Sequence, residues 1–319
     1  GAIGAYNSSY GSLGSGVTSD FVKETQVKTA GFEAEYGQAT GGVVNVVTKS
    51  GGNEFTGSVF GYFRPGALES SWDPVVTPNG TVNTAARNEY DFGVSLGGPL
   101  VKDKVFFFGT FNPQFQNRSF VAPPGFPYAS LGEVERKRKI YSYAAKVTMQ
   151  ASSNHRFDVS VFGDPSKGES GLQRAGALRR FYYAGNPGTS SIEGGYSEIE
   201  YGGHSQTLRY DGIINPNWLV EASVAHASNK FYETPTVDDY IYTDVRVVPN
   251  GLSGGLGFWE NNDGSNTQFT LKSTHIFEAG GNHQFRYGVA YEDIEFTRDT
   301  QYSGAGVRIG DGRTTLTGV

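Results

Sequence analysis

The sequence contains no cysteine among its 319 residues. Disulfide bonds, thiolate metal sites and cysteine nucleophiles are therefore excluded for this chain. Long apolar runs are also missing, since hydrophobic residues make up only 37% of the chain and its mean hydropathy is -0.40. No stretch approaches the roughly 18 apolar residues that a membrane-spanning helix needs, and this excludes a helical membrane protein.

Concentrated positive charge and catalytic motifs are scarce as well. The net charge is -6, and the only dense basic run is ERKRK at residues 135–139. We interpret this run as the solvated end of a strand and not as a nucleic-acid patch, because no folded basic surface accompanies it. The five histidines form no HExxH motif, and neither a GxSxG elbow nor a GK[ST] phosphate loop is present. We therefore predict no catalytic residue, no metal site, no cofactor and no enzymatic activity.

The sequence is rich in glycine and aromatic residues, with 45 Gly, 22 Phe and 19 Tyr. A chain that is polar on average but aromatic is typical of strands with two unlike faces. Segments with alternating apolar and polar residues predict nine strands. They are residues 54–63, 88–97, 104–112, 137–150, 156–163, 203–213, 218–229, 266–277 and 283–297.

The connections between these segments alternate in length. Those after the second, fourth, sixth and eighth segments are short, and those after the other segments are long and rich in Gly, Pro, Asn and Asp. Tight turns at one end and long loops at the other are expected for a bacterial outer-membrane barrel. A soluble sandwich has loops that vary at both ends. We therefore predict an all-β fold that is part of a large antiparallel transmembrane β-barrel.

Two stretches resemble a known family. FEAEYGQATGGVVNVVTKSGGNEFTGSVFGYFR (residues 32–64) resembles the end of the plug domain and the first barrel strand of TonB-dependent outer-membrane receptors. The similarity is closest to the Oar-like group, which has a carboxypeptidase-regulatory-like N-terminal extension. NEYDFGVSLGGPLVKDKVFFFGTF (residues 88–111) resembles the second and third strands of that group. The resemblance implies a barrel of about 22 strands around a plug, and hence that this sequence is a fragment.

The resemblance also implies a domain division and a set of junction residues. Residues 1–53 are expected to form the C-terminal part of the plug domain, and residues 54–319 the N-terminal part of the barrel, with nine strands or ten if the chain after Thr314 begins another. Glycines suit a change of chain direction or a close backbone approach, and VVNVVT suits a strand buried on both faces. The predicted plug-to-barrel motif consists of Glu35, Tyr36, Gly37, Gly41, Gly42, Asn45, Thr48, Lys49, Gly51 and Asn53.

Ligand contacts can be predicted only in the long connections. TVDDYIYTD (residues 236–244) and ENNDGSN (residues 260–266) concentrate carboxylates and amides, and we expect both to be solvated outer loops because their spacing does not fit an EF-hand. Asp238 and Asp239 in the first loop are candidate ligand contacts. Phe258 and Trp259, just before the second, could stack on the rings of a ligand.

The resemblance implies a function in the bacterial outer membrane. It predicts active uptake of a bulky, scarce ligand, either siderophore, saccharide or peptide, with TonB as a partner through an upstream segment. Outer-membrane lipid and other envelope proteins are further expected partners, and nucleic acid is not. One alternative is a structural or adhesive surface protein that uses the barrel as an anchor. A passive porin and a soluble secreted β-sandwich are two others, and the plug-like segment argues against the porin.

Overall fold

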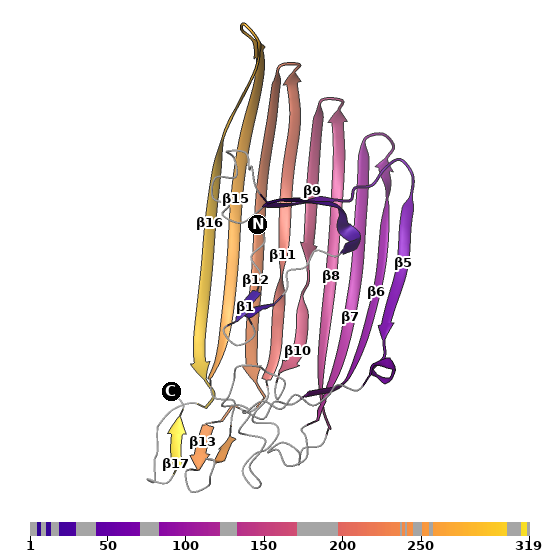
Figure 1. The fold of residues 1–319 in the computed structure, drawn as a ribbon. Helices are drawn as coiled ribbons and strands as arrows, with labels where there is room; N and C mark the ends of the chain where they lie inside the picture. The colour runs from indigo at the N-terminus through magenta and orange to yellow at the C-terminus, as the bar shows by residue number, and fades with distance from the viewer. Residues whose placement is uncertain are drawn as a thin grey trace.

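The fold was determined from a computed structural model (Figure 1). The structure describes residues 5–7, 11–13, 19–29, 43–70, 83–121, 133–170, 197–236, 238–239, 241–244, 251–254, 258–304 and 314–317. They form strands and two short 3-10 helices, η1 (Ser19–Phe21) and η3 (Gly66–Leu68). Among these residues, no helix is long and apolar enough to cross a membrane.

One antiparallel sheet of ten strands, called the wall below, dominates the molecule (Figure 1). Its strands are β5 (Thr56–Arg64), β6 (Asn83–Val101), β7 (Val105–Val121), β8 (Glu133–Ser152), β9 (His155–Gly163), β10 (Ser166–Ser170), β11 (Ser197–Asn215), β12 (Trp218–Pro235), β15 (Phe258–Glu278) and β16 (Asn282–Tyr302). β9 and β10 both pair with β8 and β11, so they share one position in the wall. The wall therefore has nine strand positions, and β5 and β16 are its edges.

The nine predicted strands are all present and follow one another across the wall in sequence order. Most are longer than predicted, and they reach 21 residues in β15 and β16. Short turns join β6 to β7, β8 to β9, β11 to β12 and β15 to β16, all at the same end of the wall (Figure 1). The long connections lie at the opposite end. The alternation of short and long connections predicted from the sequence is therefore confirmed.

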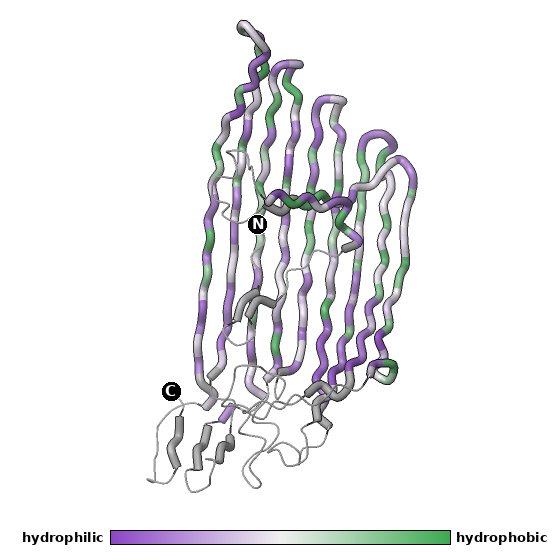
Figure 2. Tube along the Cα trace, viewed as in Figure 1, coloured by the Kyte–Doolittle hydropathy of each residue, from purple (hydrophilic) through white to green (hydrophobic). Residues whose placement is uncertain are grey.

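The wall has two chemically different faces, because alternate side chains of a strand point to opposite sides. One face, called the outer face, carries rows of exposed apolar side chains. One such row is formed by the cross-strand partners Leu208, Val224, Phe269 and Tyr291. The other face, called the inner face, carries polar side chains such as Lys146 and Asp158. Figure 2 shows the resulting alternation of hydrophobic and hydrophilic residues along the strands. An exposed apolar band of this kind faces lipid in outer-membrane barrels.

Aromatic rings gather on the outer face near both ends of the apolar band. Near the short turns, His275 lies between Trp218 and Tyr287, with ring centroids 5.3 and 5.7 Å away. Near the long connections, Phe63 packs edge-on against Tyr90 and Phe92, at 6.0 and 5.3 Å. Such rings are typical of the two interfaces between lipid and water in a barrel.

A charge in the middle of the outer face is expected to destabilise the protein. Leu271 is 38% exposed, and its cross-strand partners are Ala222 and Val289. We expect Leu271→Arg to cost about 2–4 kcal/mol in the full-length protein, because the guanidinium would lie in hydrocarbon. Urea unfolding in lipid vesicles measures this cost. The matched control is Gln268→Arg on the inner face, where the new charge would meet Glu292; an equal loss in both variants would contradict the assignment of the faces.

Three smaller sheets accompany the wall in the described residues. β1 (Ala5–Asn7) pairs with β2 (Gly11–Leu13). β3 (Val22–Lys28) pairs with β4 (Val43–Thr48), and together with η1 they form a unit that we call the inner segment, which crosses the inner face of the wall (Figure 1). β13 (Ile241–Asp244) pairs with β14 (Gly251–Gly254) and with β17 (Thr314–Thr317). The chain after Thr314 therefore does not add a tenth position to the wall.

Candidate functional site

The inner segment is anchored to the wall by one phenylalanine. Phe21, at the end of η1, is 0% exposed, and its ring centroid lies 6.1 Å from that of Phe108 on β7. Ala144 and Phe162 complete this apolar contact. Burying a phenylalanine side chain contributes about 1.5–3 kcal/mol. The backbone N–H of Lys49 donates a hydrogen bond to the carbonyl of Phe21 at 2.7 Å, so both ends of the inner segment meet here.

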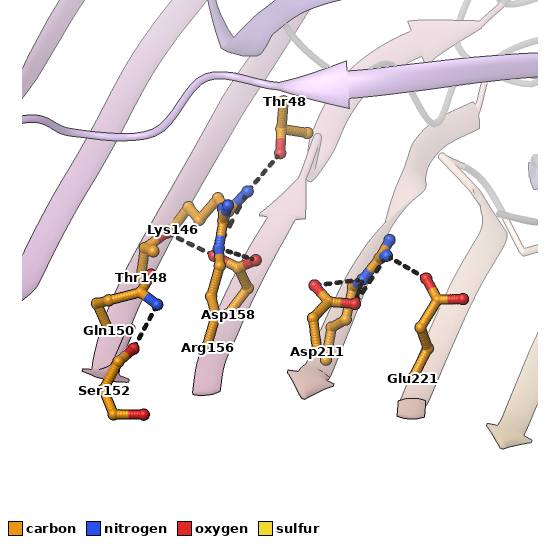
Figure 3. A network of polar contacts seen from close by, with 10 residues as sticks. Thr48, Lys146, Thr148, Gln150, Ser152, Arg156, Asp158, Asp211 and Glu221 are labelled. Carbon is orange, nitrogen blue, oxygen red and sulfur yellow. Dashed lines mark hydrogen bonds and ion pairs between the residues drawn. The ribbon is translucent and has the colours of Figure 1, made fainter. Parts of the chain in front are cut away.

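A polar cluster on β8 and β9 lies beside this anchor (Figure 3). Lys146 Nζ donates a hydrogen bond to Thr48 Oγ1 of the inner segment at 3.2 Å. The same ammonium lies 3.7 Å from the Asp158 carboxylate, which also pairs with Arg156 Nε at 3.1 Å. Thr148 donates a further hydrogen bond to Asp158. Lys146 therefore joins the inner segment to a charge cluster that belongs to the wall.

A groove lined by paired charges continues along the inner face toward the short turns. Arg209 lies 2.9 Å from Asp211 and 3.1 Å from Glu221, as Figure 3 shows for the two carboxylates. The charged residues that line the groove are Arg156, Arg209, Asp211, Glu221 and Arg286. Paired charges keep this part of the inner face hydrophilic, which a water-filled passage requires.

The chain passes from the inner segment to the first wall strand through a tightly packed junction. A side chain at Gly51 would bring its Cβ to 2.1 Å from the Phe107 carbonyl oxygen and to 2.8 Å from that of Gly98. Only glycine permits this approach of three backbones. Asn53 then clamps the turn between β6 and β7. Its Nδ2 donates to Asp103 Oδ1 at 2.6 Å, and its Oδ1 accepts the backbone N–H of Asp103 at 2.8 Å.

The hydrogen bonds between Asn53 and Asp103 account for the backbone conformation of that turn. Asp103 has a φ of 63°, and it is the only non-glycine residue with a positive φ in the part of the chain that the structure describes. Aspartate tolerates this conformation better than most residues do. The two hydrogen bonds between Asn53 and Asp103 stabilise Asp103 in this conformation. Asn53 thus fixes the end of the inner segment to the first short turn of the wall.

The structure brings together one half of the predicted junction motif. Thr48, Lys49, Gly51 and Asn53 all contact the wall or the inner segment, as described above. Asn45 lies in β4, opposite Gln26 of β3. The remaining predicted residues, Glu35, Tyr36, Gly37, Gly41 and Gly42, lie outside the described residues.

The predicted ligand contacts do not lie in one loop. Phe258 and Trp259 begin β15, and ENNDGSN (residues 260–266) continues that strand, so the prediction of an outer loop is wrong for these residues. Their polar composition is compatible with a strand because β16 pairs with the backbone from Phe258 onward and β12 pairs with it from Asn262 onward. Asp238 accepts the backbone N–H of Gly304 at 2.7 Å. These four residues therefore remain separate candidates for ligand contact.

Three contact residues could not be predicted from the sequence. Phe21 belongs to no alternating segment, and Lys146 and Asp158 are ordinary polar residues of amphipathic strands. The pairing of β8 with β9 brings Lys146 and Asp158 together on the wall, and Phe21 meets this region from the inner segment. Among the described residues, no group of three His, Asp or Glu side chains could hold a metal ion.

Comparisons with known proteins agree with this architecture. Residues 47–313 match the family model described as an outer membrane beta barrel domain. The chain is 26% identical to the TonB-dependent transporter Oar of Myxococcus xanthus over 92% of its own length, and this confirms the resemblance to the Oar-like group. It spans about a third of that relative, 34% of its length.

A solved structure supports the fold independently. The crystal structure of the outer membrane transporter YddB from Escherichia coli superposes with a TM-score of 0.69 at 14% sequence identity. The superposition covers 92% of this chain and 38% of that protein. At this identity the likeness concerns the fold alone, and it fits a wall that is part of a larger barrel.

Proposed function

This chain belongs to the family of outer membrane β-barrel domains and lies in the outer membrane of a bacterium, and we propose that the whole protein is a TonB-dependent transporter of a bulky, scarce ligand. The ligand is a siderophore, a saccharide or a peptide. Residues 1–53 are the C-terminal part of a plug, and residues 54–319 are the N-terminal part of the barrel. TonB transmits energy from the proton gradient of the inner membrane to the plug.

The attachment of the inner segment to the wall carries this proposal. Over η1 and β4, the contacts include the Phe21 anchor, the hydrogen bond from Lys146 to Thr48, and Lys49, whose ammonium lies 6.0 Å from the centroid of the Phe108 ring. The two hydrogen bonds between Asn53 and Asp103 lie beyond β4, at the junction with the wall. One buried phenylalanine and one such hydrogen bond contribute only a few kcal/mol, about 2–4 in total. A unit held this weakly on a hydrophilic face can be displaced without unfolding the wall.

The energy available for displacement is of the same order. A charge that crosses the inner membrane releases about 2.3 kcal/mol per 100 mV. A pull on the plug, driven by one or two such charges, is thus comparable to the attachment of the inner segment. Displacement would open the hydrophilic inner face to a ligand bound above it. The wall meanwhile stays intact, because its backbone hydrogen bonds are satisfied between neighbouring strands.

One observation favours a second candidate, a surface protein that uses the barrel as an anchor. Strands β13, β14 and β17 form a small sheet within the long connections, beside the end of the wall that would face the cell exterior (Figure 1). Structured outer extensions could bind another protein as well as a small ligand. This candidate needs no energy source, and contact with TonB therefore discriminates between the two.

Binding of TonB to the full-length protein in detergent tests the proposed function. The purified periplasmic domain of TonB is the probe, and surface plasmon resonance measures binding. We expect saturable binding that is competed by a peptide copied from the N-terminal segment of the full-length chain. Absence of binding, or binding that the peptide does not compete, would favour the anchor.

A further inference from the structure

Four arginines lie close together on the inner face near the long connections, and three of them are direct cross-strand partners. Arg87 on β6 is the direct cross-strand partner of Arg118 on β7, and Arg118 is in turn the direct partner of Arg136 on β8. Arg138 follows on the inner face of β8, two residues further along the strand. We call Arg87, Arg118, Arg136 and Arg138 the arginine row. Like charges that lie directly opposite one another destabilise a sheet, so this arrangement has a cost in the absence of a counterion.

The arginine row lies outside the lipid band. The adjacent row of cross-strand partners, on the outer face, consists of Asn88, Asn117 and Lys137. Because the outward side chains at this height are polar or charged, this part of the wall lies outside the hydrocarbon region. Arg118 points to the same side as Phe108, which contacts the inner segment, because both are even-numbered residues of an uninterrupted strand. The arginine row therefore faces the interior of the barrel.

Acidic side chains lie at both ends of the arginine row: Glu169 accepts the backbone N–H of Lys137 at 3.1 Å, and Glu89 lies beside Arg87 and Arg118. Glu89 lies 2.6 Å from Arg87, 3.7 Å from Arg64 and 3.9 Å from Arg118, so one carboxylate is shared by three guanidinium groups. Glu69 pairs with Arg64, and Asp91 accepts a hydrogen bond from Asn112. Among the described residues, Arg118 Nε is buried and has no hydrogen-bond partner. Burial and the neighbouring Arg87 and Arg138 lower the pKa of Arg118 below its usual value.

Polar and aromatic groups surround the arginine row in a way that suits a ligand with several anionic groups. Gln116 accepts a hydrogen bond from Arg118 at 3.2 Å, which orients one side of that guanidinium. The guanidinium of Arg138 lies 5.9 Å from the centroid of the Tyr201 ring. Planar guanidinium groups held in this manner present two parallel donors to a carboxylate or a phosphate.

We propose that the arginine row is a binding surface for a soluble ligand that carries several carboxylate or phosphate groups. This inference rests on the proposed function, because it identifies the chemical class of the transported ligand. The ERKRK run thus has two roles. Arg136 and Arg138 face the ligand on the inner face, whereas Lys137 and Lys139 are on the outer face of the same strand.

Titration of the full-length protein in detergent with tripolyphosphate, and separately with citrate, tests the proposal. We expect saturable binding of at least one probe by isothermal titration calorimetry at 150 mM salt. Arg118→Gln is expected to weaken it about tenfold or more, because a hydrogen bond to a charged group is lost. Arg118→Lys keeps the charge but not the paired donors, and it is expected to weaken binding less than Arg118→Gln does.

The matched control is Lys137→Gln, which removes one positive charge at the same height on the outer face. It is expected to leave binding unchanged. Equal losses in Arg118→Gln and Lys137→Gln, or no binding of either probe by the unmodified protein, would overturn the proposal. If Arg118→Gln does not fold, protection of Arg118 from phenylglyoxal by the bound probe replaces it, measured by mass spectrometry in the unmodified protein. Failure of protection would count against the proposal in the same way.

Failure of anion binding and failure of TonB binding have different meanings. Binding of TonB without binding of either anion would overturn the arginine row as the ligand site and leave transport standing. Anion binding that depends on Arg118, without binding of TonB, would support the site but contradict active transport. The arginine variants are expected to bind TonB as the unmodified protein does, since the contacts described above between the inner segment and the wall are made by Phe108, Ala144, Phe162 and Lys146.

Discussion

Replacing Asp158 with alanine is expected to destabilise the full-length protein by about 3–5 kcal/mol, the range found when one partner of a buried ion pair is removed. Asp158 is 9% exposed and lies between Lys146 at 3.7 Å and Arg156 at 3.1 Å. Its loss leaves two cations close together on a largely covered part of the inner face. Thr148 also loses its hydrogen-bond acceptor.

The midpoint of urea unfolding in lipid vesicles measures this effect. Asp158→Asn is expected to lie between alanine and the unmodified protein, because it retains an acceptor for Thr148 but removes the charge. Asp211→Ala is the matched control. Asp211 pairs with Arg209 on the same face, but its side chain is 34% exposed, and a loss of about 1 kcal/mol or less is expected. Equal effects at Asp158 and Asp211 would contradict a special role for the cluster beneath the inner segment.

Gly51→Ala is expected to have the second large effect. The new Cβ would lie 2.1 Å from the Phe107 carbonyl oxygen, 2.8 Å from the Gly98 carbonyl oxygen and 3.0 Å from the Gly98 nitrogen. All three atoms belong to the backbone of the paired strands β6 and β7, so no side-chain movement can relieve the clash. The expected cost is about 3 kcal/mol, at the upper end of the range for overpacked sites.

Gly52→Ala is the control for this prediction, because a Cβ at Gly52 would meet nothing within 4 Å. An alanine there is expected to change stability by less than about 1 kcal/mol. The fraction of protein that keeps its folded electrophoretic mobility without heating, and the urea midpoint, measure both variants. If Gly51→Ala and Gly52→Ala behave alike, the junction does not approach the wall as closely as described.

The strands could be predicted because lipid on one side and polar groups on the other impose a period of two. The lengths of the strands could not be predicted, because this alternation depends on lipid and the strands extend beyond it. Beyond the lipid band both faces are polar, so the alternation disappears although the strand continues. The stretch of residues 260–265 near the start of β15 is of this kind. Because this stretch of β15 does not alternate, its sequence predicts a loop.

The candidate site could be predicted only where it depends on local chemistry. Gly51 and Asn53 were identified because a glycine and an asparagine suit a change of chain direction. Lys146, Asp158 and the arginine row were not, because their meaning depends on which residues lie opposite them. Arg87, Arg118 and Arg136 are separated by 31 and 18 residues in the chain, and only the register of β6, β7 and β8 makes them neighbours.

The proposed transport requires that energy from TonB lifts the inner segment off the wall. Ala144 offers a direct probe, because it belongs to the wall but is only 2% exposed under Phe21 and Phe108. Since this chain lacks cysteine, Ala144→Cys introduces a unique thiol within it. Thr270→Cys is the control, on the inner face of β15, which β9, β11 and β12 separate from β8.

The measurement is the rate at which a maleimide reagent labels each thiol in growing cells, with and without a protonophore. Any cysteine elsewhere in the full-length protein is first replaced. We expect Ala144→Cys to be labelled faster when the proton gradient is intact, and Thr270→Cys to be labelled at the same rate in both conditions. An Ala144→Cys rate that does not depend on the gradient would contradict displacement of the inner segment and favour a static anchor.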